Sequence, residues 1–414
     1  MEVLLSTHDF AWIGGTQTYA VTVAEHLEQL GHDVTIYGLE LGEMAEAARR
    51  RGLRVVGSQR ELPEAVDVVY AQEGITPLEL GGRYPETPCV VALQSRENSL
   101  WLPPQLPGTI AALVVLSDGV RARAASYPNT PKVVRLRQPV DTVRFSPRGP
   151  LRRARPRVLL LGNYVSGERR RLVFQACDEL GYEYRQVGYK SDVVSFEPEA
   201  MLNDVDIVVG KARVIVEAIA CGRAAFVYDQ DGGDGWVTPE KYPELEADNF
   251  GGRVSGEIYD LDRLREELAE YRPELGPPNR DLAVRNHNAT RHAEALVGLF
   301  ERLAPRASPP GTPLAELARL MRLQWQATAR ATTLAGEAQT TRERLEELAA
   351  EHEALHGELI RTRQALEEAE RQAREAWERE QELRGTRRYR LAGALAAPLD
   401  AARSLAWRNG GGSG

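Results

Sequence analysis

Lysine, cysteine and long apolar runs are scarce in this chain of 414 residues. Its three cysteines, Cys89, Cys177 and Cys221, stand far apart among apolar neighbours, which excludes a disulfide framework and a cysteine metal site. We expect them to be reduced core residues of a cytosolic protein. No run approaches the roughly 18 uncharged apolar residues that a membrane-spanning helix needs. The first residues lack a basic segment and a small-residue cleavage site, so we expect no secretory signal.

Positive charge is also in deficit. The chain has 52 basic and 60 acidic residues, and the net charge of -8 argues against a general nucleic-acid-binding protein. No G-x-G-x-x-G sequence follows the opening strand of either half, which disfavours a nicotinamide-dependent dehydrogenase. No G-x-x-x-x-G-K-[ST] sequence is present, which excludes a P-loop.

The sequence is rich in short β-branched runs that alternate with longer amphipathic stretches up to about residue 300. This alternation predicts βαβ units and parallel sheets. The first series of strands is expected at Val3–Ser6, Val34–Tyr37, Val55–Gly57, Val66–Tyr70, Cys89–Leu93, Leu113–Leu116 and Lys132–Arg135. The second is expected at Arg157–Gly162, Glu183–Val187, Val205–Val209 and Ala224–Tyr228. Together they predict an α/β fold with two Rossmann-like domains, 1–147 and 155–302, whose ligand cleft faces the carboxyl ends of both sheets.

After a Pro-rich linker at residues 303–313 the composition changes. Residues 314–384 contain no proline, and 15 of their 20 a and d heptad positions, counted from Leu317, are Leu or Ala. This repeat predicts a coiled coil, on the order of 100 Å long, that joins copies of the chain. His352, at an a position, is expected to set the register. The alternative is a solitary charged helix, which would leave the leucines in water.

A basic tail follows at residues 385–409. Between Arg384 and Arg408 the sequence has six arginines and one acid, interleaved with leucines and aromatic residues. We expect an amphipathic helix that is attracted to anionic lipid, so that residues 385–408 contact the inner face of the cell membrane peripherally. The alternative is a solvated tail that caps the coiled coil. Residues 410–414 have the composition of a flexible Gly/Ser linker or a cloning remnant.

The loop after the first predicted strand contains two adjacent glycines, Gly14 and Gly15. At the junction of a strand and a helix, such a pair lets backbone N–H groups approach an anion or a sugar. The pair alone is a weak signal, because two glycines also form ordinary turns.

Five stretches together, in order and spacing, resemble the retaining glycosyltransferases of the GT-B fold (family 4), which include bacterial mannosyl- and glucosyltransferases. They are the Gly14–Gly15 loop, Leu30–Ile36, Gln138–Pro147, Val158–Gly162 and Val216–Arg223. The resemblance covers about residues 1–302. It implies transfer of a sugar from a nucleotide diphosphate-sugar donor, held by the second domain, to an acceptor held by the first domain. It implies no metal and no cofactor besides the donor.

Departure of a nucleoside diphosphate builds negative charge, so the site needs cations or aligned N–H groups. Arg169 and Arg170 follow the loop that begins at Gly162 and Asn163, and they are candidate donor-binding residues. Lys211 and Arg213 open the helix that leads to Glu217, and we expect them to act in catalysis. Since only four of the 52 basic residues are lysines, Lys211 is unusual in this chain. The alternative for the arginines is that they solvate a helix surface.

Two further donor contacts are expected in the second domain. Glu217 resembles the second carboxylate of the family's paired-glutamate motif, which grips ribose hydroxyls; otherwise it pairs only locally. The Gly-rich stretch that contains Gly232 and Gly233 either encloses the donor or forms only a tight turn.

Three positions depart from the family pattern. The family's first glutamate is replaced by Val209, the histidine that contacts the transferred sugar by Gln94, and the arginine after the second domain's first strand by Asn163. We retain Gln94 as a candidate catalytic residue.

Two hypotheses follow. The first is an active glycosyltransferase that builds a cell-surface polysaccharide, glycolipid or glycoprotein on the cytosolic side of a membrane. The second is a catalytically degenerate scaffold or sugar-binding subunit, oligomerised by its coiled coil.

Overall fold

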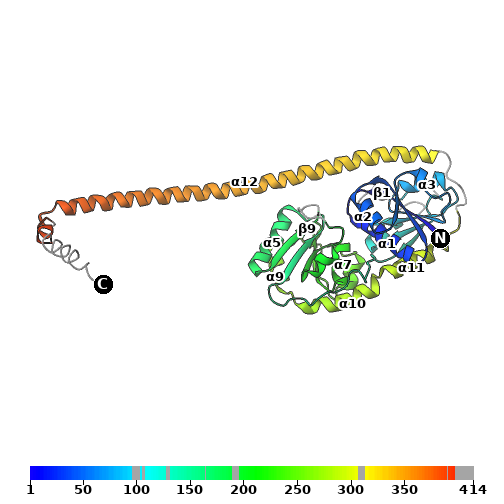
Figure 1. Cartoon of the computed structure of the whole chain (residues 1–414), viewed down its shortest axis with the longest axis horizontal. Coiled ribbons are helices and arrows are strands. Elements are labelled where there is room, and N and C mark those ends of the chain that lie inside the picture. The colour runs from blue at the N-terminus through cyan, green and yellow to red at the C-terminus, as the bar shows by residue number, and fades with distance from the viewer. Residues whose placement is uncertain are drawn as a thin grey trace, which may run out of the picture. The chain divides into compact units, whose positions relative to one another are not determined.

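The computed structural model describes residues 1–95, 103–104, 108–126, 131–163, 165–188, 195–305, 313–388 and 390–396. The chain divides into two units, Met1–Gly336 and Glu337–Gly414. The first unit contains both sheets and the beginning of the long helix α12 (Figure 1).

Seven parallel strands form the first sheet, in the order β3-β2-β1-β4-β5-β6-β7. They are β1 (Glu2–Phe10), β2 (Asp33–Leu41), β3 (Arg54–Val56), β4 (Val68–Ala71), β5 (Cys89–Leu93), β6 (Ala112–Val115) and β7 (Lys132–Arg135). The central strands are buried on both faces, which explains their nearly continuous apolar sequences. The strand order reverses at β1, so the crevice beyond its carboxyl end is where such sheets bind ligands.

Helices cover both faces of this sheet. One face packs against α1 (Gly15–Gln29), α2 (Glu43–Arg50) and α11 (Ala289–Phe300). The other packs against α3 (Thr76–Arg83) and α4 (Asp118–Ala125).

The second sheet has five strands in the order β12-β11-β10-β8-β9. They are β8 (Arg157–Leu161), β9 (Glu183–Val187), β10 (Ile207–Gly210), β11 (Ala224–Asp229) and β12 (Gly232–Trp236). One face is covered by α5 (Gly167–Leu180) and α9 (Leu261–Ala269), the other by α6 (Glu199–Asn203), α7 (Arg213–Ala220), α8 (Tyr242–Ala247) and α10 (Gly276–Asn286). Strand β12 runs antiparallel to β11 after a two-residue turn. The sequence pattern indicated only a Gly-rich crossover there, because glycines hide a strand's side-chain alternation.

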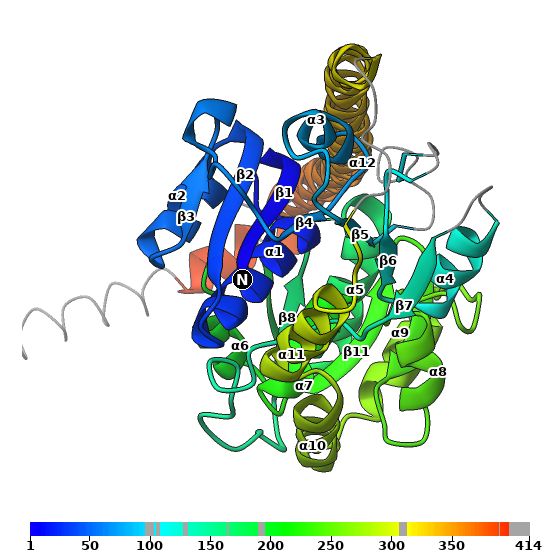
Figure 2. The ribbon, with the colours of Figure 1, turned by 90° about the vertical axis from the view of Figure 1, so that its right-hand side faces the viewer.

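Helix α11 joins the core of the first domain, although the sequence-based boundary at 302 assigned it to the second. Its residues Ala293, Leu296 and Phe300 pack in one cluster with Tyr19 of α1. Figure 2 shows α11 crossing beside α1. Composition marks where a domain ends but not which core a terminal helix joins, so this packing is visible only in the structure.

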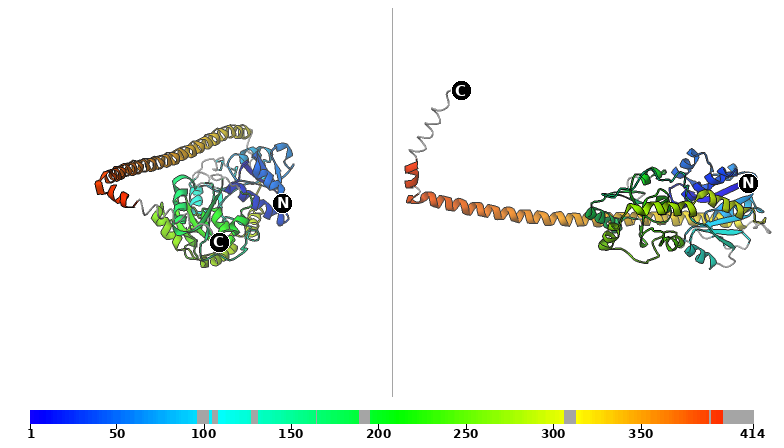
Figure 3. Two further views of the ribbon diagram at one scale, coloured as in Figure 1. Left: turned by 60° about the vertical axis from the view of Figure 1, so that its left-hand side comes forward. Right: turned by 90° about the horizontal axis from the view of Figure 1, so that it is seen from below.

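The expected two Rossmann-like domains followed by a long helix are confirmed. Helix α12 (Pro313–Gly385) is continuous in both views of Figure 3. Its beginning packs on the first domain: Ala318 contacts Leu78, Trp325 lies 4.6 Å from the ring of His8 between centroids, and Arg322 pairs with Glu79. The sequence assigned this whole stretch to the coiled coil.

Within the second unit, the leucines of the heptad seam are exposed; Leu345, Leu355 and Leu366 are each about 60% exposed or more. A coiled coil needs a second helix, so it stays a prediction. Among the described helices, none has the length and apolar character to cross a membrane. The described residues exclude most of the basic tail, because they omit residue 389 and residues 397–414.

Candidate functional site

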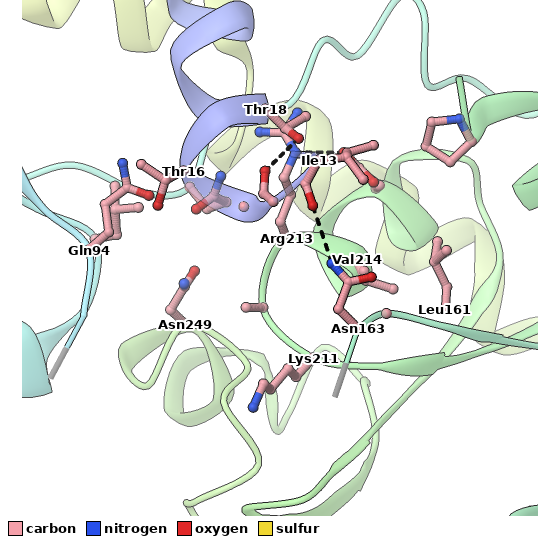
Figure 4. A pocket seen from close by; sticks show the side chains of 18 of the residues that line it. Ile13, Thr16, Thr18, Gln94, Leu161, Asn163, Lys211, Arg213, Val214 and Asn249 are labelled. Carbon is pink, nitrogen blue, oxygen red and sulfur yellow. Dashed lines mark hydrogen bonds and ion pairs between the residues drawn. The ribbon is translucent and has the colours of Figure 1, made fainter. Parts of the chain in front are cut away.

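A cavity of about 540 Å³ lies between the two domains. Its walls come from the segments that follow β1 and β5 in the first sheet and β8, β10 and β11 in the second. The cavity therefore faces the carboxyl ends of strands in both sheets, as the sequence predicted. Figure 4 shows Thr16, Thr18 and Gln94 on the side of the first domain and Asn163 and Lys211 on the side of the second.

Most of the predicted site residues meet at this cavity. Those that line it are Gly14, Gly15, Gln94, Gly162, Asn163, Lys211, Arg213 and Glu217. The four others, Arg169, Arg170, Gly232 and Gly233, are described by the structure but lie outside the lining.

The Gly14–Gly15 pair places the beginning of α1 at the cavity. Gly14 is the N-cap, and no side chain in the described part of the chain caps the helix there. A Cβ atom added to Gly15 would meet no described atom within 4 Å, so the space beside it is open. Backbone N–H groups and the positive end of the helix dipole thus face a space that a ligand can enter.

A strained residue, Ala212, lies between Lys211 and Arg213 in the second domain. Ala212 has a φ of +51°, in the left-handed region that alanine rarely adopts, and its N–H donates to the carbonyl oxygen of Phe250 at 2.9 Å. This bend lies between Lys211 and Arg213, at the point where α7 begins. Such strain concentrates at functional sites, because the surrounding structure must hold it in place.

Lys211 lies in an acidic cluster at the end of the second sheet. Its Nζ is 3.0 Å from Asp231 Oδ2 and 3.5 Å from Asp229 Oδ2. Burial raises the pKa of Asp229, and the nearby Lys211 opposes this shift. Arg253 lies 4.0 Å from the same oxygen of Asp231 and 3.5 Å from Asp248. All five side chains line the cavity.

Arg213 and Glu217 form a buried pair beneath the cavity. Arg213 Nε donates to Glu217 Oε1 at 2.7 Å, and a second nitrogen donates to Thr22 Oγ1 at 2.9 Å, across the domain boundary. Burial raises the pKa of Glu217, and Arg213 opposes the shift. Because these bonds occupy both side chains, their arrangement holds the two domains together as well as lining the cavity.

The three residues that differ from the family pattern, Val209, Asn163 and Gln94, have different surroundings. Val209 is fully buried among core residues between β10 and α5, so its side chain points away from the cavity. Asn163 Nδ2 donates to the carbonyl oxygen of Ile13 at 3.3 Å, which links the second domain to the Gly14 loop. Gln94 Nε2 donates to Gln72 Oε1 at 2.6 Å, at the rim of the cavity.

The four predicted residues outside the lining occupy positions within the fold of the second domain. Arg169 donates to the carbonyl oxygen of Asp229 at 2.7 Å, behind the acidic cluster. A Cβ atom on Gly232 would lie 2.6 Å from the Gly252 carbonyl oxygen, and one on Gly233 would lie 2.7 Å from Tyr259. The two glycines are therefore needed for close packing of β12. Arg170 lies in the first turn of α5.

Three arginines that line the cavity, Arg51, Arg144 and Arg253, were not among the predicted site residues. Arg51 Nε lies 2.6 Å from Glu25, and Arg144 Nε lies 2.9 Å from Glu199. Arg144 belongs to the Gln138–Pro147 stretch, so that motif was an available signal. Arg51 and Arg253 have no distinguishing pattern in the sequence. Across the described ranges, no three His, Cys, Asp or Glu side chains are grouped so as to hold a metal ion.

Known proteins resemble this chain in fold but not detectably in sequence. No family model matches it, and no curated protein matches it. Among solved structures, HepE of Anabaena, in complex with UDP and glucose, matches 73% of this chain and 100% of its own at a TM-score of 0.52 and 10% identity. Sucrose-phosphate synthase of Thermosynechococcus elongatus matches 73% of this chain and 98% of its own, with a TM-score of 0.47 and 12% identity. At such identities the likeness to HepE establishes the GT-B fold alone. The likeness to sucrose-phosphate synthase, with its lower TM-score, carries no further conclusion.

Proposed function

We propose that this chain is a glycosyltransferase that transfers a sugar from a nucleotide diphosphate-sugar to an acceptor of a cell-surface polysaccharide, glycolipid or glycoprotein. The observation that carries the proposal is the interdomain cavity, where the start of α1, the strained Ala212 and Lys211 converge. HepE, which has the same fold, was solved with UDP and glucose, and this supports a nucleotide-sugar as the occupant.

The chemistry of the leaving group fits this lining. When the sugar departs, negative charge builds on the nucleoside diphosphate and must be stabilised. Lys211 supplies a positive charge, and the first turns of α1 and α7 supply N–H groups and the positive ends of two helix dipoles. Helix N-termini and lysine side chains are among the groups by which proteins bind phosphate without a metal.

A binding and turnover assay tests the proposal. UDP-, GDP- and ADP-sugars are titrated calorimetrically into the full chain, and release of nucleoside diphosphate is followed with the donor that binds. We expect one donor to bind, and Lys211→Ala to lower turnover by about 10²-fold, the usual scale for one charge-stabilising group. Lys241→Ala is the matched control, because Lys241 is exposed and lies outside the cavity. Absence of binding by every donor would refute the proposal.

Two finer points rest on the resemblance to family 4. We propose that the transferred sugar keeps its anomeric configuration and that no metal is required. NMR of the first product formed tests the stereochemistry, and turnover in excess EDTA tests the second point. An inverted product or loss of turnover with EDTA would contradict them.

A scaffold or sugar-binding role is the second candidate. Two observations favour it. The Glu217 carboxylate, expected to grip the donor, is already paired with Arg213, and the family's other glutamate is replaced by the buried Val209. A protein of this kind would bind a sugar or nucleotide without turnover in the assay above.

We propose that the protein is a cytoplasmic homo-oligomer, peripherally attached to the membrane. The exposed leucine seam of α12 supports the oligomer. The membrane contact rests on the arginines of residues 385–408. Co-sedimentation with anionic liposomes tests it: the full chain should pellet and a chain ending at residue 384 should not.

A further inference from the structure

The acidic cluster beside Lys211 has one carboxylate in an unusual position. A single oxygen, Asp231 Oδ2, lies 3.0 Å from Lys211 Nζ and 4.0 Å from Arg253 Nη1. The two cations come from different segments, one after β10 and one from the loop after α8. An anionic oxygen held between two cations at the wall of a ligand cavity is the arrangement that a bound phosphate oxygen would have.

We propose that Asp231 occupies the place of a donor phosphate between Lys211 and Arg253, and that the diphosphate displaces it on binding. The proposal rests on the proposed function, because it assumes that a nucleotide enters this cavity. It adds Arg253 as the second cation for the diphosphate and Asp231 as an internal competitor that sets the affinity of the site.

The two aspartates of the cluster differ in freedom to move. Asp229 is the last residue of β11, is 3% exposed, and accepts a hydrogen bond from the backbone N–H of Gln230. Asp231 lies in the two-residue turn between β11 and β12, and its side chain is 29% exposed. Rotation of the Asp231 side chain into solvent therefore breaks its ion pairs without disturbing the strand.

The charge balance favours such a displacement. Among the described residues, the cations Lys211, Arg253 and Arg169 gather at the end of β11 with the carboxylates Asp229, Asp231 and Asp248. While these six side chains remain paired, they add little net attraction for a diphosphate. Once Asp231 leaves, the remaining charge is positive and Lys211 and Arg253 face the incoming oxygens.

The Asp231→Asn variant tests the idea, because asparagine is well accepted in such turns and the fold is retained. Removal of the competing charge should tighten binding of the nucleoside diphosphate that the chain recognises in a UDP, GDP and ADP panel. We expect about three- to tenfold, the scale of two partly exposed ion pairs. The matched control is Asp204→Asn: Asp204 also contacts two arginines, Arg157 and Arg185, but on the surface outside the cavity.

Two further measurements separate this role from a structural one. The parent nucleoside, which carries no phosphate, should bind the Asp231→Asn variant and the wild type equally. In an Arg253→Gln background, the nucleotide should bind more weakly and the gain from Asp231→Asn should shrink.

Each outcome is decisive. If a nucleotide binds the wild type and Asp231→Asn leaves its affinity unchanged or weakens it, Asp231 is not a competitor, and the proposed function stands. If no nucleotide binds either form, both proposals fail.

Discussion

The hydroxyl group of Tyr19 donates a hydrogen bond of 2.8 Å to Nε2 of His292, and this bond joins α1 to α11 over 273 residues of sequence. The other ring nitrogen, Nδ1, bonds the carbonyl oxygen of Arg137 at 3.0 Å. A carbonyl oxygen only accepts, so Nδ1 carries the proton and Nε2 accepts from Tyr19. The neutral ring of His292 thus fixes α11 to both α1 and the segment that follows β7.

The first prediction concerns acid stability. Burial lowers the pKa of His292 to about 3, so the unfolded chain takes up a proton below about pH 6.5 that the folded chain excludes. Stability is therefore fully present above pH 6.5 and is lost as pH falls toward 3. Between pH 7 and pH 4.5 the wild type loses unfolding free energy, and we expect His292→Asn to reduce that loss by about 2 to 3 kcal/mol, measured by urea unfolding. His356→Asn, at an exposed position in α12, is the matched control substitution. If the unfolding free energy of all three proteins fell equally with pH, the prediction that His292 stays neutral in the folded chain would be contradicted.

The second prediction concerns the buried pair of Arg213 and Glu217, which are 8% and 4% exposed. Removal of one partner leaves the other charge buried without its ion pair, so we expect Glu217→Ala to cost about 3 to 5 kcal/mol of folding free energy. Replacement of both, Arg213→Met with Glu217→Leu, should cost less than the sum of the two single changes, because no buried charge remains. A double-mutant cycle by chemical denaturation measures this coupling. Additive costs would mean that the pair is not coupled.

Local pattern was sufficient to predict much of this fold. The strand Cys89–Leu93 was predicted with its observed bounds, because a β-branched and apolar run marks a buried strand. The edge strands Lys132–Arg135 and Glu183–Val187, which are mostly exposed or half-buried, also have the predicted bounds. The Gly14–Gly15 loop lies at the cavity, because the parallel topology fixes its position after a central strand.

What the sequence could not predict depends on partners far apart in the chain. The family resemblance suggested a ligand contact for Glu217. Its bond to Arg213 lies within α7, but the bond from Arg213 to Thr22 exists only when the two domains meet. Likewise, no pattern indicates that the Asp231 turn reaches Lys211. Contacts of this kind decide the chemistry of the site, whereas periodicity reports only which residues are buried.

The third prediction concerns the beginning of α12. Trp325 is 6% exposed and packs on His8, whereas Trp377, farther along the same helix, is 62% exposed. We expect Trp325→Ala to destabilise the first domain by about 3 kcal/mol, the low end for loss of a buried aromatic side chain. Trp377→Ala should leave its unfolding unchanged. Equal effects of the two changes on thermal unfolding of the full chain would refute docking of this segment.

The fourth prediction concerns the partner of the α12 seam, for which we propose a second copy in parallel register. In this arrangement each g residue faces the e residue of the next heptad in the other helix. Glu337 then faces Arg342 and Glu358 faces Arg363, each pair of opposite charge, while Arg379 faces Arg384 as one repulsive pair. The attractive pairs outnumber the repulsive one, so the charges favour parallel alignment over isolated helices.

Cysteine cross-linking distinguishes this arrangement from the alternatives. The native cysteines are buried, so an introduced cysteine reports alone. Ala376→Cys, at a d position far from the helix centre, should form a disulfide between copies under mild oxidation, because equivalent d residues meet only when the helices run parallel in register. Ala350→Cys, at an f position on the opposite face, should not. A dimer in solution that fails to cross-link at Ala376 would indicate an antiparallel pair, and a monomer would establish α12 as a solitary charged helix.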